Sequence, residues 1–333
     1  MNKVSGKRLI YILKAVLFVL IGLVLFRCIS LVFVEKSSFA KYKNYKAQDR
    51  VDLLILGSSH SDVGINAGLL RDTVAQAGYQ INAFNYSIYG MRIEQMYFFL
   101  REILKDQDPS LIIIDTYSFL PIAEEHREIL ARRAFDVFPF SMNKLEAIQY
   151  LIPEDRWSFY VPFIKYHSRW KELSDRDFTM QYDPAAWSGA GILGNGSTEA
   201  MEDTDGYFET DTSRITGVRP INATEKECFE KILSLAEEKD IRILLTTVPF
   251  KEQLGMDSLR LIEINNYLRN EYVDGGGLRL LDMNLLWKEL DFGYGDLLNE
   301  GHCNAGGAAK VTACLAEYII DNYDLAELGG RRK

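Results

Sequence analysis

The chain has 333 residues, of which 47% are hydrophobic and 26% charged, and its formal net charge is −9. This length is enough for one large α/β domain or two small ones, and the composition excludes a chain that is disordered throughout. The negative charge argues against nucleic acid as the main partner, because no basic field is present to displace counterions from phosphates.

The first predicted element is an apolar segment at residues 9–34, interrupted only by Lys14 and Arg27. About 20 apolar residues cross the hydrocarbon core of a bilayer. Basic residues cluster before the segment, so the positive-inside rule predicts a signal anchor with residues 1–8 in the cytoplasm. We expect a single-pass protein of the cell membrane whose remaining residues are extracytoplasmic. A cleaved signal peptide is the alternative, but the apolar run is longer than a usual h-region.

A polar, basic stretch at residues 35–50 is expected to form a juxtamembrane stalk, and strand and helix patterns alternate after it. Strands are predicted at residues 51–56, 79–87, 110–115, 241–250 and 278–284, and helices at residues 67–77, 92–105, 224–239, 258–270 and 305–323. This alternation predicts one domain at residues 51–325 with a doubly wound parallel sheet, in a flavodoxin-like three-layer α/β/α arrangement. A polar tail follows at residues 326–333.

An insertion at about residues 120–222 exceeds what a βαβ crossover needs. It contains three of the four tryptophans and an acidic, turn-rich loop. Its aromatic side chains are expected either to pack into a core or, as a cover over the crevice at the strand ends, to contact a substrate.

Ser59 directly follows the first predicted strand and begins a predicted helix, where backbone N–H groups favour an oxyanion. A serine nucleophile needs a base within hydrogen-bond reach, and histidine is the usual choice. His60 points away from its neighbour Ser59, so we expect it to contact substrate. His126 is predicted to be exposed, and His167 to line a pocket or pack. His302, in a Gly-rich loop before the last predicted helix, is the expected base.

The turn Gly57-Ser58-Ser59, with His302 and Asn304 before the last helix, resembles the SGNH/GDSL hydrolase family over about residues 51–323. The resemblance implies the SGNH hydrolase fold, with Ser59 as nucleophile and His302 as base and acid. The family places an orienting aspartate three residues before the histidine, and Asn299 occupies that position here. Either Asn299 or Asp296 therefore orients His302, or the site works as a near-dyad.

The resemblance also implies an oxyanion hole formed by the backbone N–H groups of Ser59 and Gly90, the glycine that follows the second strand. The family's asparagine after the third strand has no counterpart, so a third donor is not identified. The substrate pocket is expected to include His60, Tyr117 and Asn304. The sequence has no cysteine pair typical of zinc sites and no nucleotide-binding motif, so we expect neither metal nor cofactor.

We therefore expect a membrane-anchored, extracytoplasmic serine esterase or O-acyltransferase that acts on an acylated cell-envelope polysaccharide or polymer through an acyl-enzyme on Ser59. Membrane-anchored proteins of this family act in teichoic-acid D-alanylation and polysaccharide O-acetylation, and this likeness implies a multi-pass membrane acyltransferase as partner. The alternative, motivated by Asn299, is a catalytically impaired SGNH-fold protein that binds envelope polymers or helps to assemble them.

Overall fold

A five-stranded sheet in which all neighbouring strands are parallel forms the centre of the structure. The computed structural model describes residues 3–34, 36–121, 124–179, 196–201, 215–251, 256–273 and 277–329. The strands are β1 (Leu53–Leu56), β2 (Ala83–Asn85), β3 (Leu111–Asp115), β4 (Arg242–Thr247) and β5 (Leu278–Asp282). Their order, β2-β1-β3-β4-β5, is that of flavodoxin-like doubly wound sheets. The predicted α/β class and parallel sheet are confirmed.

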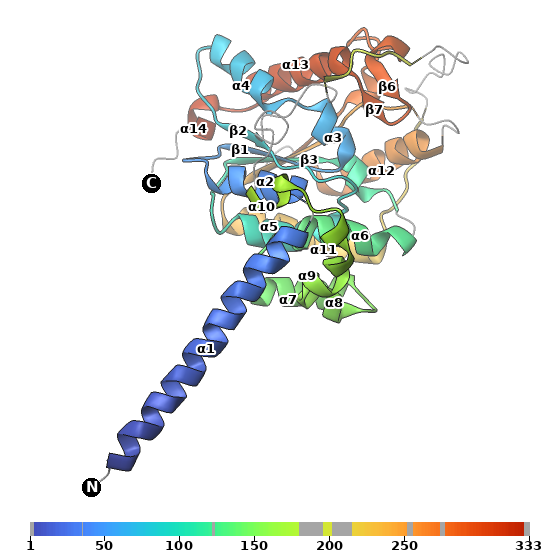
Figure 1. Cartoon of the computed structure of the whole chain (residues 1–333). Helices are drawn as coiled ribbons and strands as arrows, with labels where there is room; N and C mark the ends of the chain where they lie inside the picture. The colour runs from blue at the N-terminus through green and yellow to red at the C-terminus, as the bar shows by residue number, and fades with distance from the viewer. Residues whose placement is uncertain are drawn as a thin grey trace.

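Both faces of the sheet are buried, because successive side chains of a strand point to opposite faces. Leu54 and Leu56 belong to one hydrophobic core, and Leu53 and Ile55 belong to the other. The first core is closed by α5 (Ile93–Ile103), α11 (Ala223–Glu238) and α12 (Met256–Tyr272), and the second by α4 (Ala67–Gln76) and α13 (Ala305–Asn322). Figure 1 shows the sheet between these two helical layers.

The helix α1 (Lys3–Phe33) is long and apolar enough to cross a membrane, a test that a signal sequence near the N-terminus also passes. The expected stalk after it is instead a second helix, α2 (Lys36–Lys46), which packs into the domain. Tyr45 is fully buried, and its hydroxyl donates a hydrogen bond to the Ile103 carbonyl at 3.2 Å. Lys41 is also buried and forms an ion pair with Asp62.

The longest described part of the insertion is helical and lies away from the carboxyl ends of the strands, whereas Met201, in a shorter described part, lies against Leu297. Residues 124–179 are called the helical insertion here; they form α6 (Glu124–Phe135), α7 (Met142–Leu151), α8 (Arg156–Tyr160), α9 (Pro162–Tyr166), the 3₁₀ helix η2 (His167–Lys171) and α10 (Asp175–Thr179). They pack against α5 and the end of α1, on the side of the sheet opposite α13 (Figure 1). Trp187 and most of the acidic loop lie outside the described residues.

The C-terminus is also more ordered than expected. A short helix, α14 (Leu325–Gly329), extends into the expected polar tail and buries Leu325 and Leu328. Residues 330–333 lie outside the described residues.

Candidate active site

Ser59 lies at a tight junction between a strand and a helix. β1 ends at Leu56, and Ser59 is the first residue of α3 (Ser59–Gly64). Ser58 caps this helix, because its Oγ accepts a hydrogen bond from the His60 N–H at 3.3 Å. A Cβ added to Gly57 would lie only 2.5 Å from the Cβ of Asp115. A glycine is therefore needed for the close approach of this turn to the end of β3.

His302 lies on a small antiparallel hairpin formed by β6 (Leu297–Asn299) and β7 (His302–Cys303). Residues Glu300 and Gly301 form the turn, and the register pairs Asn299 with His302 across the hairpin. α3 contacts β7, so the hairpin lies beside the helix that begins at Ser59 (Figure 1). The hairpin thus places the candidate base next to both its amide partner and the serine.

The three side chains form a continuous hydrogen-bonded chain. His302 Nε2 lies 2.8 Å from Ser59 Oγ, and His302 Nδ1 lies 3.0 Å from Asn299 Oδ1. The Gly301 backbone N–H donates to the same Asn299 oxygen at 3.0 Å. Because a backbone N–H can only donate, Oδ1 is an acceptor, and His302 Nδ1 carries the proton. His302 Nε2 is then unprotonated and can accept the Ser59 hydroxyl proton.

Asp296, the other candidate for orienting His302, is engaged elsewhere. Its Oδ2 accepts hydrogen bonds from the Gly293 N–H and from Lys310 Nζ, both at 2.9 Å. A Cβ added to Gly307 would collide with the Asp296 carbonyl oxygen, so α13 packs directly on this backbone. Of the two candidates, Asn299 is the residue in contact with His302.

His60 lies buried beneath the candidate base and stacks between two rings. Its imidazole is 3.6 Å from the Tyr117 ring and 5.0 Å from the His302 ring, centroid to centroid, with interplanar angles of 27° and 28°. Its Nδ1 lies 3.3 Å from Ser58 Oγ, which also donates to Asp115 Oδ2 at 3.4 Å. The His60 ring, itself packed on Tyr117, therefore helps to hold the His302 ring in place.

Burial dominates the electrostatics of these groups. It lowers the pKa of His302, and it lowers the pKa of His60 well below the usual histidine value, with His302 and Arg92 acting in the same direction. Burial also raises the pKa of Asp115 to about 6, against the opposing effect of hydrogen bonds from the Tyr117 N–H and the Ser58 hydroxyl. Both histidines are thus neutral at neutral pH, as a general base must be.

A cavity of about 550 Å³ opens beside Ser59. Its lining includes the expected residues Ser59, His60, Tyr117, Asn299 and His302, and also Met201, Phe250, Lys251, Leu298, Glu300 and Gly301. Phe250 and Lys251 follow β4, and ligands bind at the carboxyl ends of parallel strands. Both residues could therefore have been predicted from the sequence as part of the site. Glu300-Gly301 is not among the common two-residue hairpin turns, so the sequence carried no clear signal for this hairpin. Nothing in the sequence pointed to Met201, because it comes from the far end of the insertion.

Two expected site residues do not line this cavity. Gly90 lies in the turn after β2 with φ +76°, and an added Cβ would collide with Leu130. Asn304 is 3% exposed and caps α13: its Oδ1 accepts from the Gly307 N–H at 3.1 Å, and its Nδ2 donates to the Gly295 carbonyl at 2.7 Å. Asn304 therefore holds the loop before α13 in place, away from the cavity lining.

The remaining groups of interest lie away from Ser59 or are buried. His167 is exposed on η2, in the helical insertion, and the side chain of His126 is outside what the structure describes. Cys303 is buried, with its sulfur 3.8 Å from the Pro249 carbonyl, as expected for a structural thiol. No group of three or more His, Cys, Asp or Glu side chains that could hold a metal is found in the described part of the chain.

Comparison with known proteins gives no match, either to a protein-family model or to a curated protein. What the site can do therefore follows from its own residues and geometry.

Proposed function

We propose that the protein is a serine esterase or O-acyltransferase with an SGNH-type site, in which Ser59 is the nucleophile. The observation that supports this most strongly is the chain from Ser59 through His302 to Asn299, with distances of 2.8 and 3.0 Å. Such a chain of nucleophile, base and orienting group activates a hydroxyl in unrelated hydrolases. Its place at the carboxyl ends of parallel strands, beside a cavity, agrees with a catalytic role.

In the first half-reaction, Ser59 Oγ attacks the carbonyl carbon of an ester, and its proton moves to His302 Nε2. The Ser59 N–H, at the first position of α3, has no acceptor within the helix and donates to the developing oxyanion. When the tetrahedral intermediate collapses, the bond to the leaving alcohol breaks. The alcohol takes the proton from His302, and the acyl group stays on Ser59.

In the second half-reaction, water or an acceptor hydroxyl attacks the acyl-enzyme and gives its proton to His302. Collapse of this intermediate releases the acid or the transferred ester, and the His302 proton returns to Ser59 Oγ. Hydrolase and transferase therefore differ only in which hydroxyl enters the cavity.

The substrate that we propose is an acylated cell-envelope polysaccharide or polymer outside the cytoplasm. Anchorage by α1, with basic residues on its N-terminal side, supports this location. The cavity combines apolar side chains such as Phe250 and Met201 with the polar Lys251 and Glu300, which suits an acyl group on a hydroxyl-rich carrier. A transferase would need a multi-pass membrane partner to supply activated acyl groups.

A second candidate is a catalytically impaired protein of the same type that binds or helps to assemble envelope polymers. Two observations favour it. Asn299 brings no negative charge to His302, and Gly90, the expected second oxyanion donor, is not part of the cavity lining.

Ester turnover by the full-length protein separates the two candidates. We expect wild type to release acetate from 4-nitrophenyl acetate and from an O-acetylated polysaccharide. Ser59→Ala and His302→Ala should lose this activity, whereas His167→Ala, which changes an exposed histidine in the helical insertion, should retain it. Turnover that is unchanged in Ser59→Ala would exclude Ser59 as nucleophile, and a wild type without turnover would favour the binding protein.

A further inference from the structure

The helix α1 has an N-terminal part whose residues are exposed, called the bare part here, and a C-terminal part that other elements cover. Every residue from 6 to 26 is exposed, as are Cys28 and Ile29, whereas Ser30 and, just after the helix, Val34 are each 2% exposed. At about 1.5 Å per residue the bare part rises about 32 Å, which matches the roughly 30 Å thickness of a bilayer's hydrocarbon core. The change from bare to covered helix near Arg27 thus marks where the lipid core would end.

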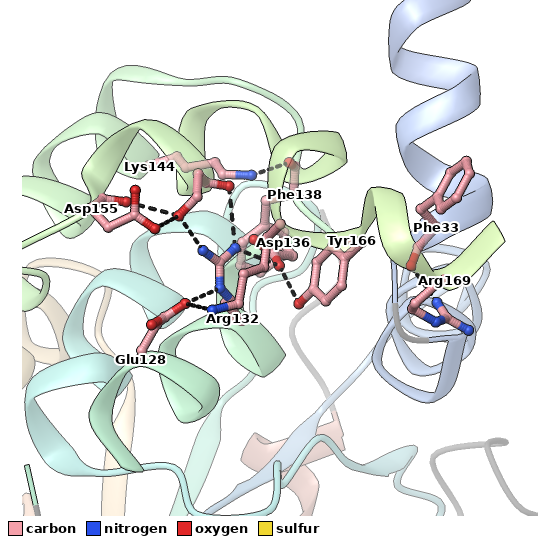
Figure 2. A network of polar contacts seen from close by, with 11 residues as sticks. Phe33, Glu128, Arg132, Asp136, Phe138, Lys144, Asp155, Tyr166 and Arg169 are labelled. Atoms are coloured by element: carbon pink, nitrogen blue, oxygen red, sulfur yellow. Dashed lines mark hydrogen bonds and ion pairs between the residues drawn. The ribbon is translucent and has the colours of Figure 1, made fainter. Parts of the chain in front are cut away.

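The helical insertion is what covers α1 beyond this point. Arg27 Nη2 donates to the Val137 carbonyl at 3.0 Å. The Phe163 ring packs edge-on against Phe26, with the centroids 6.1 Å apart, and Arg169 donates to the Phe33 carbonyl (Figure 2). The insertion therefore begins at the level of the bilayer surface.

The inside of the helical insertion is rich in charged and polar side chains. Arg132 is 3% exposed, lies against the Phe159 ring, and bonds with Glu128 at 2.9 Å and the Ser158 carbonyl at 3.2 Å (Figure 2). Asp136 is also buried and accepts a hydrogen bond from the Tyr166 hydroxyl at 2.8 Å.

The outside of the helical insertion carries large apolar side chains instead. Six of them are between 51% and 75% exposed: Phe140, Met142, Trp157, Ile164, Trp170 and Phe178. Ile164, Trp170 and Phe178 lie on α9, η2 and α10, the three elements that contact α1. Such a set is unusual on a surface that faces water, whereas tryptophan and phenylalanine are favoured at the membrane interface.

We propose that the helical insertion docks on the outer leaflet of the bilayer that α1 crosses, with Trp157, Ile164 and Trp170 at the level of the lipid headgroups. Lipid is the occupant because α9 and η2, which carry Ile164 and Trp170, contact α1 at the height where its bare surface ends, and α8, which carries Trp157, packs against α9. The docking would fix the orientation of the domain on the membrane. It rests on the proposed membrane anchorage and is independent of catalysis.

Quenching of tryptophan fluorescence by brominated lipids tests the docking. The full-length protein is placed one copy per phosphatidylcholine nanodisc, with or without bromine on the acyl chains. Variants keep a single tryptophan, at position 157, 170 or 287, with phenylalanine at the others. Trp287 is the control, because it packs on the Phe292 ring at 4.7 Å, against the core on the α13 side of the sheet. Thermal unfolding checks that each variant is folded.

We expect brominated lipid to remove much of the emission of Trp157 and Trp170 and little of the emission of Trp287. Equal, weak quenching of all three tryptophans would overturn the proposal. The exposed apolar surface would then be explained by contact with a second copy of the chain or with a membrane protein. If a single-tryptophan variant does not fold, wild type is compared with Trp157→Phe/Trp170→Phe, whose quenching should be much weaker; equal quenching would also overturn the proposal. Ester turnover of the same sample reports on the catalytic proposal separately.

Discussion

Asn299 orients His302 through an amide oxygen, which fixes the tautomer but carries no charge. The two hydrogen bonds that this oxygen accepts, from Gly301 and His302, place the proton on His302 Nδ1. In a serine protease, replacing the orienting aspartate by asparagine costs roughly 10⁴ in kcat because the tautomer becomes wrong. Here the tautomer is the productive one, so the cost is limited to the missing stabilisation of the imidazolium.

The pH dependence of ester turnover should reflect the lowered pKa of His302. Only the neutral imidazole can accept the Ser59 proton, so activity rises as the pH increases through that pKa. We expect an acid limb centred below about 6.5, the ordinary histidine value, and a plateau from neutral pH upward. Initial rates measured from pH 4 to 9 would show this, and a limb centred above 7 would contradict it.

Asn299→Asp should move this limb to higher pH. A carboxylate beside His302 favours the imidazolium and raises its pKa by about 1 unit or more. The plateau rate should rise by about tenfold or more, since charge stabilisation is added to a correct tautomer. Asn299→Leu should lower the rate. Asp115, with a pKa of about 6, titrates in the same range. If the acid limb of the pH–rate profile does not move in Asn299→Asp, the limb reports on a group other than His302.

The sequence was enough to predict that Ser59 and His302 meet, but not which residue orients His302 or whether Gly90 lines the cavity. Ser59 follows a buried apolar strand and His302 precedes the last helix, so the sheet topology brings them to one edge. The choice of Asn299 over Asp296 depends on the register of a two-residue hairpin turn, which the pattern did not reveal. The absence of Gly90 from the cavity lining could not be predicted either, since the turn after β2 packs against Leu130, a residue of the insertion.

Among the elements, α13 sets the position of the hairpin through a close backbone contact. A Cβ on Gly307 would collide with the Asp296 carbonyl, whereas a Cβ on the exposed Gly306 would meet only side-chain oxygens, those of Asn304 at 3.3 Å and Asp296 at 3.6 Å. Gly307→Ala should therefore destabilise the protein by about 1–3 kcal/mol and reduce turnover by moving His302. Gly306→Ala should be close to neutral. Thermal unfolding and initial rates measure both effects; equal effects of the two variants would contradict this role.

The regular elements followed from local pattern, and the irregular ones did not. β1 and the first four residues of β3 are continuous apolar runs, and β4 has an apolar centre at residues 243–245, which is typical of strands buried on both faces. α2 was missed because its composition is polar and basic, although Tyr45 and Phe39 anchor it to the core. A prediction from charge alone cannot detect a helix that buries one aromatic stripe.

At the scale of the whole molecule, the cavity and the helical insertion occupy separate regions. The cavity lies where α3 meets the β6–β7 hairpin, and the insertion packs on α5 and α1 (Figure 1). A cover over the crevice was one of the two expectations for the insertion, because long loop segments often carry binding residues. Its actual place depends on packing against the end of α1, which no local pattern encodes.

This separation predicts that the helical insertion can be loosened without loss of catalysis. Arg132→Ala removes one of the two cations that act on the buried Asp136, and also the hydrogen bond to the Ser158 carbonyl, at a cost of up to about 3–5 kcal/mol in the stability of the insertion. We expect faster proteolysis within residues 124–179 and unchanged ester turnover. Lys165→Ala, which removes an exposed ion pair, should change neither. Loss of turnover in Arg132→Ala with the insertion still resistant to protease would contradict the separation.

The central claim, that His302 activates Ser59 as a nucleophile, is tested most directly by locating a covalent adduct. The full-length protein is treated with a fluorophosphonate, and intact and tandem mass spectrometry identify the modified residue. We predict a single adduct on Ser59 of wild type, no adduct in Ser59→Ala, and much slower labelling in His302→Ala. An unmodified wild type, or an adduct formed equally in Ser59→Ala, would contradict the claim.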